Sequence, residues 1–488
     1  MIDGTQAPPA IGSLQDRGLG LDPSSGSNLP PGPRAPGALQ TLRWMYQPID
    51  FMEKCRRKYG PIFSLRLGPA SNVFVIADPG AAKQVLTADP EYFRAGDTNG
   101  IFRDVVGNHS ILVMDGPEHI HHRRILLPVV GRHADRYREL ISGIARDRVA
   151  TWEPDTDIRL LGEMEAISFE VMMRIAMGTD GTSDREAKLR TLIPEMMDRC
   201  ESPFTLIPWF RHEMGGISPY ARLMRFIDGI DEILYDTISE RRADPLSEIR
   251  DDALSLLVRA TYEDGSPLED RVIRDELLTL LMAGYETTTA GLTWAFERLL
   301  RSPDKLERLT REMETGDQTY LMAVVKEALR RRPVIPIAAR KALVPIELMG
   351  YSLPAGSVLM VAIYLIHSDP ELYPEPKEFR PERFLEADPK GMEGGAWIPF
   401  GGGVRRCLGA SLAQYELAVV IRTVLEEAEL ALVQESDEPV ARRRFTLSPG
   451  REGQARVRRI SPGVNSPAGS RRFRAPKPIK VSQTEMAD

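Results

Sequence analysis

A single cysteine stands inside a glycine-rich stretch near the end of the chain. Cys407 is one of three cysteines in 488 residues, and neither Cys55 nor Cys200 is close enough in sequence to be an evident disulfide or zinc-site partner. Three glycines at 401–403 precede it and Gly409 follows it. Glycines at these places suit a backbone that turns tightly against a flat object.

The residues after the cysteine predict a helix. Apolar side chains recur at positions 413, 417, 420 and 424, so we expect the sulfur at a helix N-terminus. Free N–H groups and the helix dipole favour a thiolate there, and Arg405 and Arg406 add positive charge. This pattern predicts one soft-metal ligand beside an anionic planar cofactor, a description that fits haem. A small buried hydrophobe is the ordinary alternative for a lone cysteine.

The spacing of five positions resembles a known family. Phe400-x-x-Gly403-x-Arg405-x-Cys407-x-Gly409 is similar to the haem-ligand signature of the cytochrome P-450 family, the haem-thiolate monooxygenases. The resemblance implies that Cys407 is the metal ligand and that Phe400, Arg405 and Gly409 contact the cofactor, haem b.

A long central helix carries a second motif. Residues 271–301 are apolar on nearly every face, as a buried helix should be, yet Ala283-Gly-Tyr-Glu-Thr-Thr-Thr289 inside them is poor helix material. Thr287 is placed to bond to the Ala283 carbonyl, which would loosen the helix and admit water. A merely kinked core helix is the alternative. The resemblance makes Glu286 and Thr287 the catalytic acid–alcohol pair of the family's oxygen-activation motif.

A third motif is the pair Glu327 and Arg330. At spacing i, i+3 such a pair is often exposed and worth about 0.3 kcal/mol. In the family it is buried and joined by a downstream arginine. Arg383, in Pro381-Glu-Arg-Phe384, fits that place better than its neighbour Arg380.

Three of the seven histidines lie at 119–124, in an expected helix for which Asp115 is a candidate cap. His119 and Arg123 share a helix face at spacing i, i+4. The resemblance implies that both reach a haem propionate, as do Arg340 and Arg405. A solvated basic face is the alternative.

The same histidine run raises the question of a divalent-metal site. Arg123 and Arg124 would repel such an ion, which argues against it. We therefore expect His121 and His122 at the surface.

The candidates for the substrate pocket are apolar. The stretch 201–210 is apolar and broken by prolines, and in the family this region forms a lid. Residues 332–340 should be extended, because each proline disfavours helix in the residue before it. The resemblance implies that residues 334–339 line the pocket above the haem. An apolar lining implies a hydrophobic substrate such as a fatty acid, terpenoid, steroid or polyketide. The candidate residues are Phe204, Ala283, Val334, Ile335, Ile337 and Ala338.

Composition excludes several classes of protein. A net charge of -7 argues against a general nucleic-acid binder. Three scattered cysteines fit a reducing cytoplasm rather than a disulfide framework. The first 45 residues contain no apolar run long enough for a signal peptide or membrane span. Membrane-bound members of the family carry such an anchor, so the resemblance implies a soluble, cytoplasmic enzyme of the bacterial type.

The chain divides into three parts. Residues 1–28 are expected to be disordered, 29–460 to form one large domain, and 461–488 to form a basic disordered tail. The domain should be mainly α with small β-sheets, including a hairpin at 62–67 and 73–76 and a strand pair near 346–349 and 357–362. The resemblance implies a cytochrome P-450-type fold with haem between the central long helix and the cysteine-loop helix.

The function implied by the resemblance is insertion of one oxygen atom from O2 into a hydrophobic small molecule. No fused reductase, flavin motif or iron–sulfur cluster is visible, so electrons should come from a ferredoxin and its reductase, or a flavodoxin. A haem-thiolate peroxygenase or isomerase is an alternative, against which the intact Glu286–Thr287 pair counts. A non-catalytic haem-binding sensor is another, but no DNA-reading or signalling motif accompanies the site. The basic tail is either an inert solvated segment or a docking site for an acidic redox protein.

Overall fold

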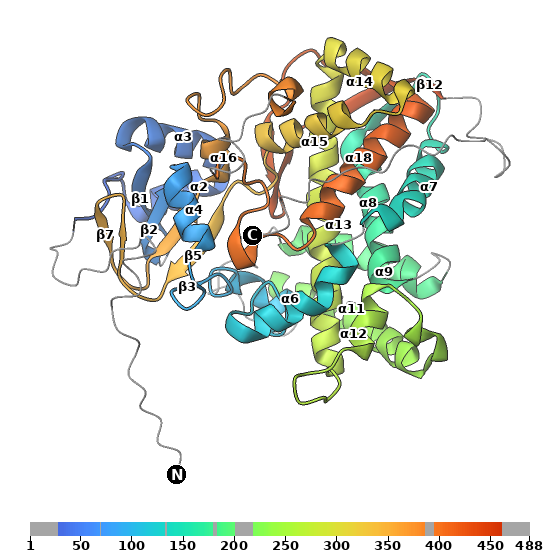
Figure 1. The fold of residues 1–488 in the computed structure, drawn as a ribbon, viewed down its shortest axis with the longest axis horizontal. Coiled ribbons are helices and arrows are strands. Elements are labelled where there is room, and N and C mark those ends of the chain that lie inside the picture. Colours follow the sequence, from blue (N-terminus) through green and yellow to red (C-terminus); the bar gives the residue numbers. More distant parts are fainter. Residues whose placement is uncertain are drawn as a thin grey trace.

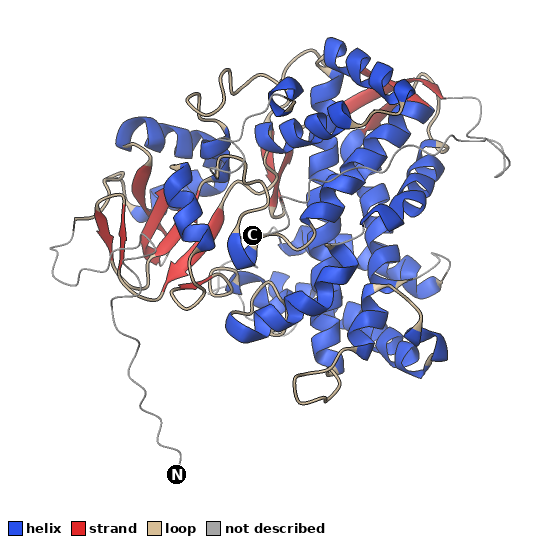
Figure 2. Ribbon diagram, in the orientation of Figure 1, coloured by secondary structure: helices blue, strands red, loops and turns tan. Residues whose placement is uncertain are grey.

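Two regions of different secondary structure make up the described part of the chain, a sheet-rich region and a larger helical region (Figures 1 and 2). The structure is a computed structural model. Except for Asn28, the expected disordered ends lie outside the residues that it describes. Those residues are 28–68, 70–131, 134–178, 183–200, 218–385 and 395–460.

The sheet-rich region is built on five strands in the order β1-β2-β8-β5-β3. The predicted hairpin is present, with Ile62 of β1 opposite Ile76 of β2. β8 runs parallel to β2, and β5 runs antiparallel to β8. The strand bounds are β1 Ile62–Leu67, β2 Ala70–Ile76, β3 Phe93–Arg94, β5 Ala338–Ala342 and β8 Val358–Val361.

The predicted pairing of 346–349 with 357–362 is wrong. β6 (Ile346–Leu348) pairs instead with β7 (Tyr351–Leu353), with Leu348 opposite Tyr351. Met349 and Gly350 between them have positive φ angles of 51° and 78°. Such a two-residue turn closes a hairpin locally. β8 is therefore free to pair with the large sheet.

The helical region is organised around α13 (Asp270–Leu300), the 31-residue helix that the apolar pattern predicted. It contacts α8, α11, α15 and α18, and Figure 1 shows it running the length of this region. The other α-helices of the described residues, in both regions, are α2 Gly37–Tyr46, α3 Pro48–Tyr59, α4 Pro79–Thr87, α5 Arg103–Val106, α6 Gly116–Val130, α7 Arg138–Val149, α8 Leu160–Met177, α9 Asp184–Cys200, α11 Pro219–Ala243, α12 Ala253–Arg259, α14 Pro303–Thr315, α15 Thr319–Arg331, α16 Ile363–His367 and α18 Ala410–Glu427.

Smaller sheets complete the helical region. β9 and β4 flank β12, and β10 pairs with β11 in a hairpin. Their bounds are β4 Asp157–Arg159, β9 Ala428–Leu432, β10 Val440–Arg443, β11 Thr446–Pro449 and β12 Gln454–Ile460. None of the helices within the described ranges has the length and apolarity needed to cross a membrane.

Glu416 is a buried carboxyl group in the packed face of α18 and should make stability depend on pH. Its side chain is 1% exposed, and desolvation raises its pKa from 4.5 to about 8, with only partial opposition from the Ser168 hydroxyl of α8. A raised carboxyl pKa means that the folded state holds a proton that the unfolded state releases. Stability should therefore fall between pH 4.5 and 8, by up to about 1.4 kcal/mol per pH unit.

We expect Glu416→Gln to flatten this decline, because a neutral amide cannot ionise. The free energy of unfolding in urea, measured at several pH values, would test it. Glu429→Gln, at an exposed position of β9, is the control and should keep the wild-type slope. Equal slopes in both variants would contradict the assignment.

Candidate functional site

The loop around Cys407 is held by its own backbone. The Cys407 N–H donates to the Phe400 carbonyl at 2.9 Å, and the Arg406 N–H donates to the Gly403 carbonyl at 2.9 Å. Gly403 has a φ of 63°, and a Cβ there would overlap the carbonyl oxygen of Leu86. Only glycine satisfies both conditions. The loop thus presents its cysteine in one fixed place, just ahead of α18.

The Cys407 side chain is both accessible and surrounded by protein atoms. These atoms desolvate it strongly enough to raise the pKa of the thiol. The Gly409 N–H and the guanidinium groups of Arg123 and Arg406 act in the opposite direction and are outweighed. The predicted thiolate therefore needs more than the helix N-terminus; a metal cation at the sulfur would supply it.

The middle of α13 is open on one face. From Val272 to Leu300 every residue is buried except Ala283, Gly284 and Thr287. The Thr287 hydroxyl donates to the Ala283 carbonyl at 2.8 Å, which is the bond expected from the sequence. Between Val272 and Leu300, the accessible surface of α13 is therefore confined to residues next to or within the predicted acid–alcohol pair.

Glu286, the predicted acid, bonds to the β10–β11 hairpin. Its Oε2 pairs with Arg444 Nη1 at 2.6 Å, and its Oε1 accepts from the Thr446 hydroxyl at 3.0 Å. Desolvation raises the pKa of Glu286, and Arg444 opposes that shift. The sequence analysis missed Arg444. The available signal was the run of three arginines at 442–444, inside the predicted domain.

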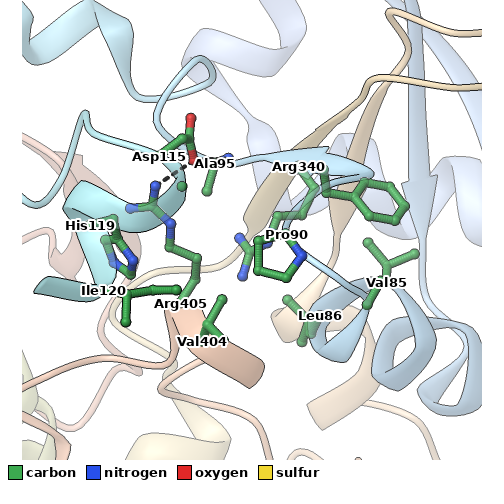
Figure 3. Close-up of a pocket in the computed structure, with 13 residues that line it drawn as sticks. Val85, Leu86, Pro90, Ala95, Asp115, His119, Ile120, Arg340, Val404 and Arg405 are labelled. Atoms are coloured by element: carbon green, nitrogen blue, oxygen red, sulfur yellow. Dashed lines mark hydrogen bonds and ion pairs between the residues drawn. The ribbon is translucent and has the colours of Figure 1, made fainter. Parts of the chain in front are cut away.

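Basic side chains line a pocket between the two regions (Figure 3). His119, Arg340 and Arg405 line it, and Asp115 is the carboxylate among its lining residues. Arg405 bonds to Asp115 and to the Ile111 carbonyl at 2.9 Å. Arg340 is buried, donates to the Ala339 carbonyl at 2.9 Å and makes no ion pair within the described ranges.

Burial, and then neighbouring positive charge, shift the pKa values in this pocket. Desolvation, then Arg405 and Arg123, lower the pKa of His119 to about 3, so the imidazole is neutral near pH 7. Desolvation, then Arg405, lower the pKa of Arg340 to about 10. The lining of the pocket therefore carries two guanidinium groups against one carboxylate and suits anionic groups.

Asp115 has a different role from the predicted cap. It is the N-cap residue of α6, but its side chain makes no capping hydrogen bond. The carboxylate instead accepts from the N–H groups of Ala95 at 3.0 Å and Gly96 at 3.1 Å, and it pairs with Arg405. The Asp115 carboxylate therefore fixes Arg405 at the pocket instead of capping α6.

The expected surface position of His122 is wrong. His122 is buried, and its Nδ1 lies 2.6 Å from Oε1 of Glu276 on α13. His121 is half-buried and stacks on Tyr262. In the described part of the chain, no group of three or more His, Cys, Asp or Glu residues could hold a metal ion. His122 is buried because it bonds to Glu276 of α13, a partner that the local sequence does not reveal.

Glu327, Arg330 and Arg383 come together in the core. Arg330 bonds Glu327 through two hydrogen bonds of 2.7 and 2.8 Å, and both side chains are 0% exposed. Arg383 Nε donates to the same carboxylate at 3.3 Å. The competing Arg380 contributes its backbone N–H to Glu327, while its guanidinium lies 3.8 Å from Glu375.

This network is connected to the segment before the cysteine loop. Arg330 also donates to the His367 carbonyl at 2.7 Å, and the His367 Nε2 accepts from the Ile398 N–H at 3.0 Å. Burial lowers the pKa of His367 to about 3, so it stays neutral and can accept that bond. The network thus fixes the backbone nine residues ahead of Cys407.

The chain is similar in sequence to known proteins over most of its length. The family model described as Cytochrome P450 matches residues 30–452. The chain belongs to the cytochrome P450 family. "Putative cytochrome P450 135B1" of Mycobacterium tuberculosis is 36% identical over 443 residues, which cover 89% of this chain and 92% of the relative. "Putative cytochrome P450 137" of the same organism is 35% identical over 403 residues, covering 82% and 84%.

Solved structures of cytochromes P450 share its fold. Retinoic acid bound cyanobacterial CYP120A1 superposes with a TM-score of 0.77 at 25% identity, covering 88% of this chain and 99% of that one. The heme domain of cytochrome P450DA has a TM-score of 0.77 at 22% identity, covering 89% and 99%. The predicted fold class is therefore confirmed, and as a cytochrome P450 the chain is a haem monooxygenase.

The residues of this cytochrome P450 fit haem by their chemistry. An accessible, desolvated sulfur on a glycine-turned loop suits a soft metal cation. A pocket with excess buried cations suits the two carboxylates of the cofactor.

The predicted substrate-pocket residues pack against different apolar clusters. Val334 packs in the main helical core, Ile337 against the cluster beneath β1 and β2, and Ala338 against the cluster beneath α4. Ile337 and Ala338 are half-buried, so part of each side chain stays accessible. Ile335 is half-buried, Ala283 is exposed on α13, and Phe204 lies outside the described residues.

Proposed function

We propose that this cytochrome P450 binds haem b through the Cys407 sulfur and inserts one oxygen atom from O2 into a hydrophobic small molecule. The observation that carries the proposal is the pairing of an accessible cysteine on a rigid glycine loop with a buried helix that, between Val272 and Leu300, is accessible only at Ala283, Gly284 and Thr287. When bound, haem supplies the activation of dioxygen.

The chain would hold the cofactor from two sides. Cys407 provides the metal ligand, and Phe400 and Gly409 shape the loop around it. His119, Arg123, Arg340 and Arg405 are proposed to receive the propionates; the buried cations of the pocket support this assignment. Arg123 also donates to the Arg406 carbonyl at 2.8 Å, which links α6 to the cysteine loop.

Thr287 and Glu286 are proposed to handle protons. The Thr287 hydroxyl lies at the accessible face of α13, where it could hold a water molecule for proton delivery. Glu286 is the nearest carboxyl group along the helix and can exchange protons with that water once it leaves the hairpin. Delivering protons at the right place favours oxygen insertion over release of peroxide.

Partners and location follow from the same reasoning. We propose a ferredoxin with its reductase, or a flavodoxin, as the electron donor, because members of the matched family generally take electrons from redox partners. A reducing cytoplasm is supported by the small number of cysteines, of which Cys55 and Cys200 are thiols buried in the core.

The substrate is proposed to be a fatty acid, terpenoid, steroid or polyketide. The solved relative CYP120A1 is described as bound to retinoic acid, an isoprenoid acid of this general kind. The open face of α13 carries Ala283 and Gly284 beside Thr287, so it is mostly apolar.

Optical titration of the purified ferric holoprotein tests the proposal. Lauric acid, retinoic acid, testosterone and a macrolide would be added separately. A saturable shift of the Soret band towards the high-spin position, followed by NADH-dependent product formation with a surrogate ferredoxin pair, is expected for one class. Turnover that occurs only with added peroxide would overturn the monooxygenase mechanism.

Thr287→Val should uncouple electron consumption from oxygen insertion. Valine keeps the shape but removes the hydroxyl, so we expect product per NADH to fall at least about tenfold while peroxide rises. Thr288→Val is the matched control, because Thr288 makes the same 2.8 Å bond to the carbonyl four residues earlier but is buried. Similar uncoupling in both variants would show that helix geometry, rather than the Thr287 hydroxyl, matters.

A further inference from the structure

The tip of the β10–β11 hairpin is held in an unusual conformation. Arg443 pairs with Thr446, so Arg444 and Phe445 form the two-residue turn. Arg444 has a φ of 52°, in the left-handed region that residues other than glycine rarely adopt. Its guanidinium is nevertheless buried, with 1% of the side chain exposed. Strain of this kind persists only where surrounding contacts maintain it.

Arg444 is held by carboxylates from three helices. Its Nη1 bonds Glu286 of α13 at 2.6 Å and Glu165 of α8 at 2.8 Å, and its Nε bonds Asp198 of α9 at 2.7 Å. The Tyr285 hydroxyl accepts from it at 3.0 Å. Both oxygens of Glu286 are therefore occupied by the hairpin, one by Arg444 and one by Thr446.

The other residue of the turn makes an aromatic contact. The rings of Phe445 and Phe102 are 4.5 Å apart and nearly perpendicular. Phe102 directly precedes α5, which is joined to α13 by a 3.2 Å hydrogen bond from Arg274 to the Val105 carbonyl. The two rings thus connect separate segments that both rest on α13. Neither ring is fully buried.

We propose that the aromatic contact at the hairpin tip controls the acid. While Phe445 contacts Phe102, Arg444 holds Glu286 towards the hairpin. Separation of the two rings turns the two-residue tip, withdraws Arg444 and frees Glu286 to move towards Thr287. Arg444 is then a positioning residue that acts through Glu286. This inference rests on the proton-handling role of Glu286 proposed above.

Phe445 and Arg444 are neighbours in one two-residue turn. A movement of either residue therefore changes the backbone of the other. The charged groups that face Glu286 are Arg444 and, at longer range, Arg443; Glu165 also contacts both arginines. Losing Arg444 therefore removes the principal cation beside Glu286.

Variants of the aromatic pair test the inference without touching the ion pairs. Infrared difference spectra of the holoprotein, recorded against pH, would follow the Glu286 carboxyl band, which Glu286→Gln identifies. In Phe445→Ala and Phe102→Ala we expect the Glu286 titration to move upward by about one pH unit, because the carboxylate loses its cation. Arg444→Gln should move it at least as far, and Arg444→Lys should largely restore it.

The control is Val440→Ala, a half-buried position of the same hairpin far from its tip. It should leave the titration unchanged. If Arg444→Gln shifts the titration and neither phenylalanine variant does, Arg444 holds the acid without the aromatic contact, and the inference is overturned. If the control shifts it equally, general loosening of the hairpin explains the effect. Wild-type coupling of NADH to product in Glu286→Gln would instead refute the proposed role of the acid.

Discussion

Cys407→Ser is expected to abolish NADH-driven oxygen insertion and to remove the thiolate signature from the spectrum of the reduced, carbon monoxide-treated protein. Serine preserves the loop, because the hydrogen bond to Phe400 comes from the backbone N–H of residue 407. A hydroxyl group is a far poorer ligand than a thiolate for the soft metal of the cofactor, and it cannot donate the same electron density. The change should therefore remove the chemistry while leaving the fold intact.

The matched control for this experiment is Cys55→Ser. Cys55 is buried, and burial raises its pKa to about 11, so it is an uncharged thiol packed in the core. Its replacement should cost about 1–3 kcal/mol of stability for a buried hydroxyl and leave the spectrum unchanged. A thiolate spectrum that survived in Cys407→Ser would disprove the ligand assignment.

Arg330→Ala is expected to have the second largest effect, on folding and cofactor content. Removing the guanidinium leaves Glu327 as a buried charge with reduced compensation, which should cost about 3–5 kcal/mol. The variant also loses the hydrogen bond to the His367 carbonyl. Since His367 supports the Ile398 backbone ahead of the cysteine loop, we expect a lower haem content in the protein that does fold.

Urea unfolding and haem-to-protein ratio would measure both effects. Arg311→Ala provides the comparison, because Arg311 bonds Glu307 on the surface of α14 at 2.6 Å and is 68% exposed. That pair should contribute less than about 0.5 kcal/mol. Similar losses in the two variants would mean that the buried network has no special part in holding the loop.

Interactions between residues close in sequence could be predicted from the sequence alone. The Thr287 bond to Ala283 and the pair of Glu327 with Arg330 span four and three residues of a helix. The hairpin of β1 and β2 closes through a short turn. Helical and strand periods place such residues together whatever the rest of the chain does. The glycines at 401–403 and 409 that shape the loop around Cys407 are likewise close to it in sequence.

Only the tertiary structure decided which distant side chains meet. Glu286 bonds Arg444, 158 residues away, and His122 bonds Glu276, 154 residues away. Asp115 is drawn from its expected cap to Arg405, 290 residues on. Each of these side chains has many possible partners of opposite charge, and the sequence does not rank them. Packing on α13 and around the cysteine loop brings one partner within reach and buries the pair, and burial makes that partner obligatory because an unpaired charge in the core is costly.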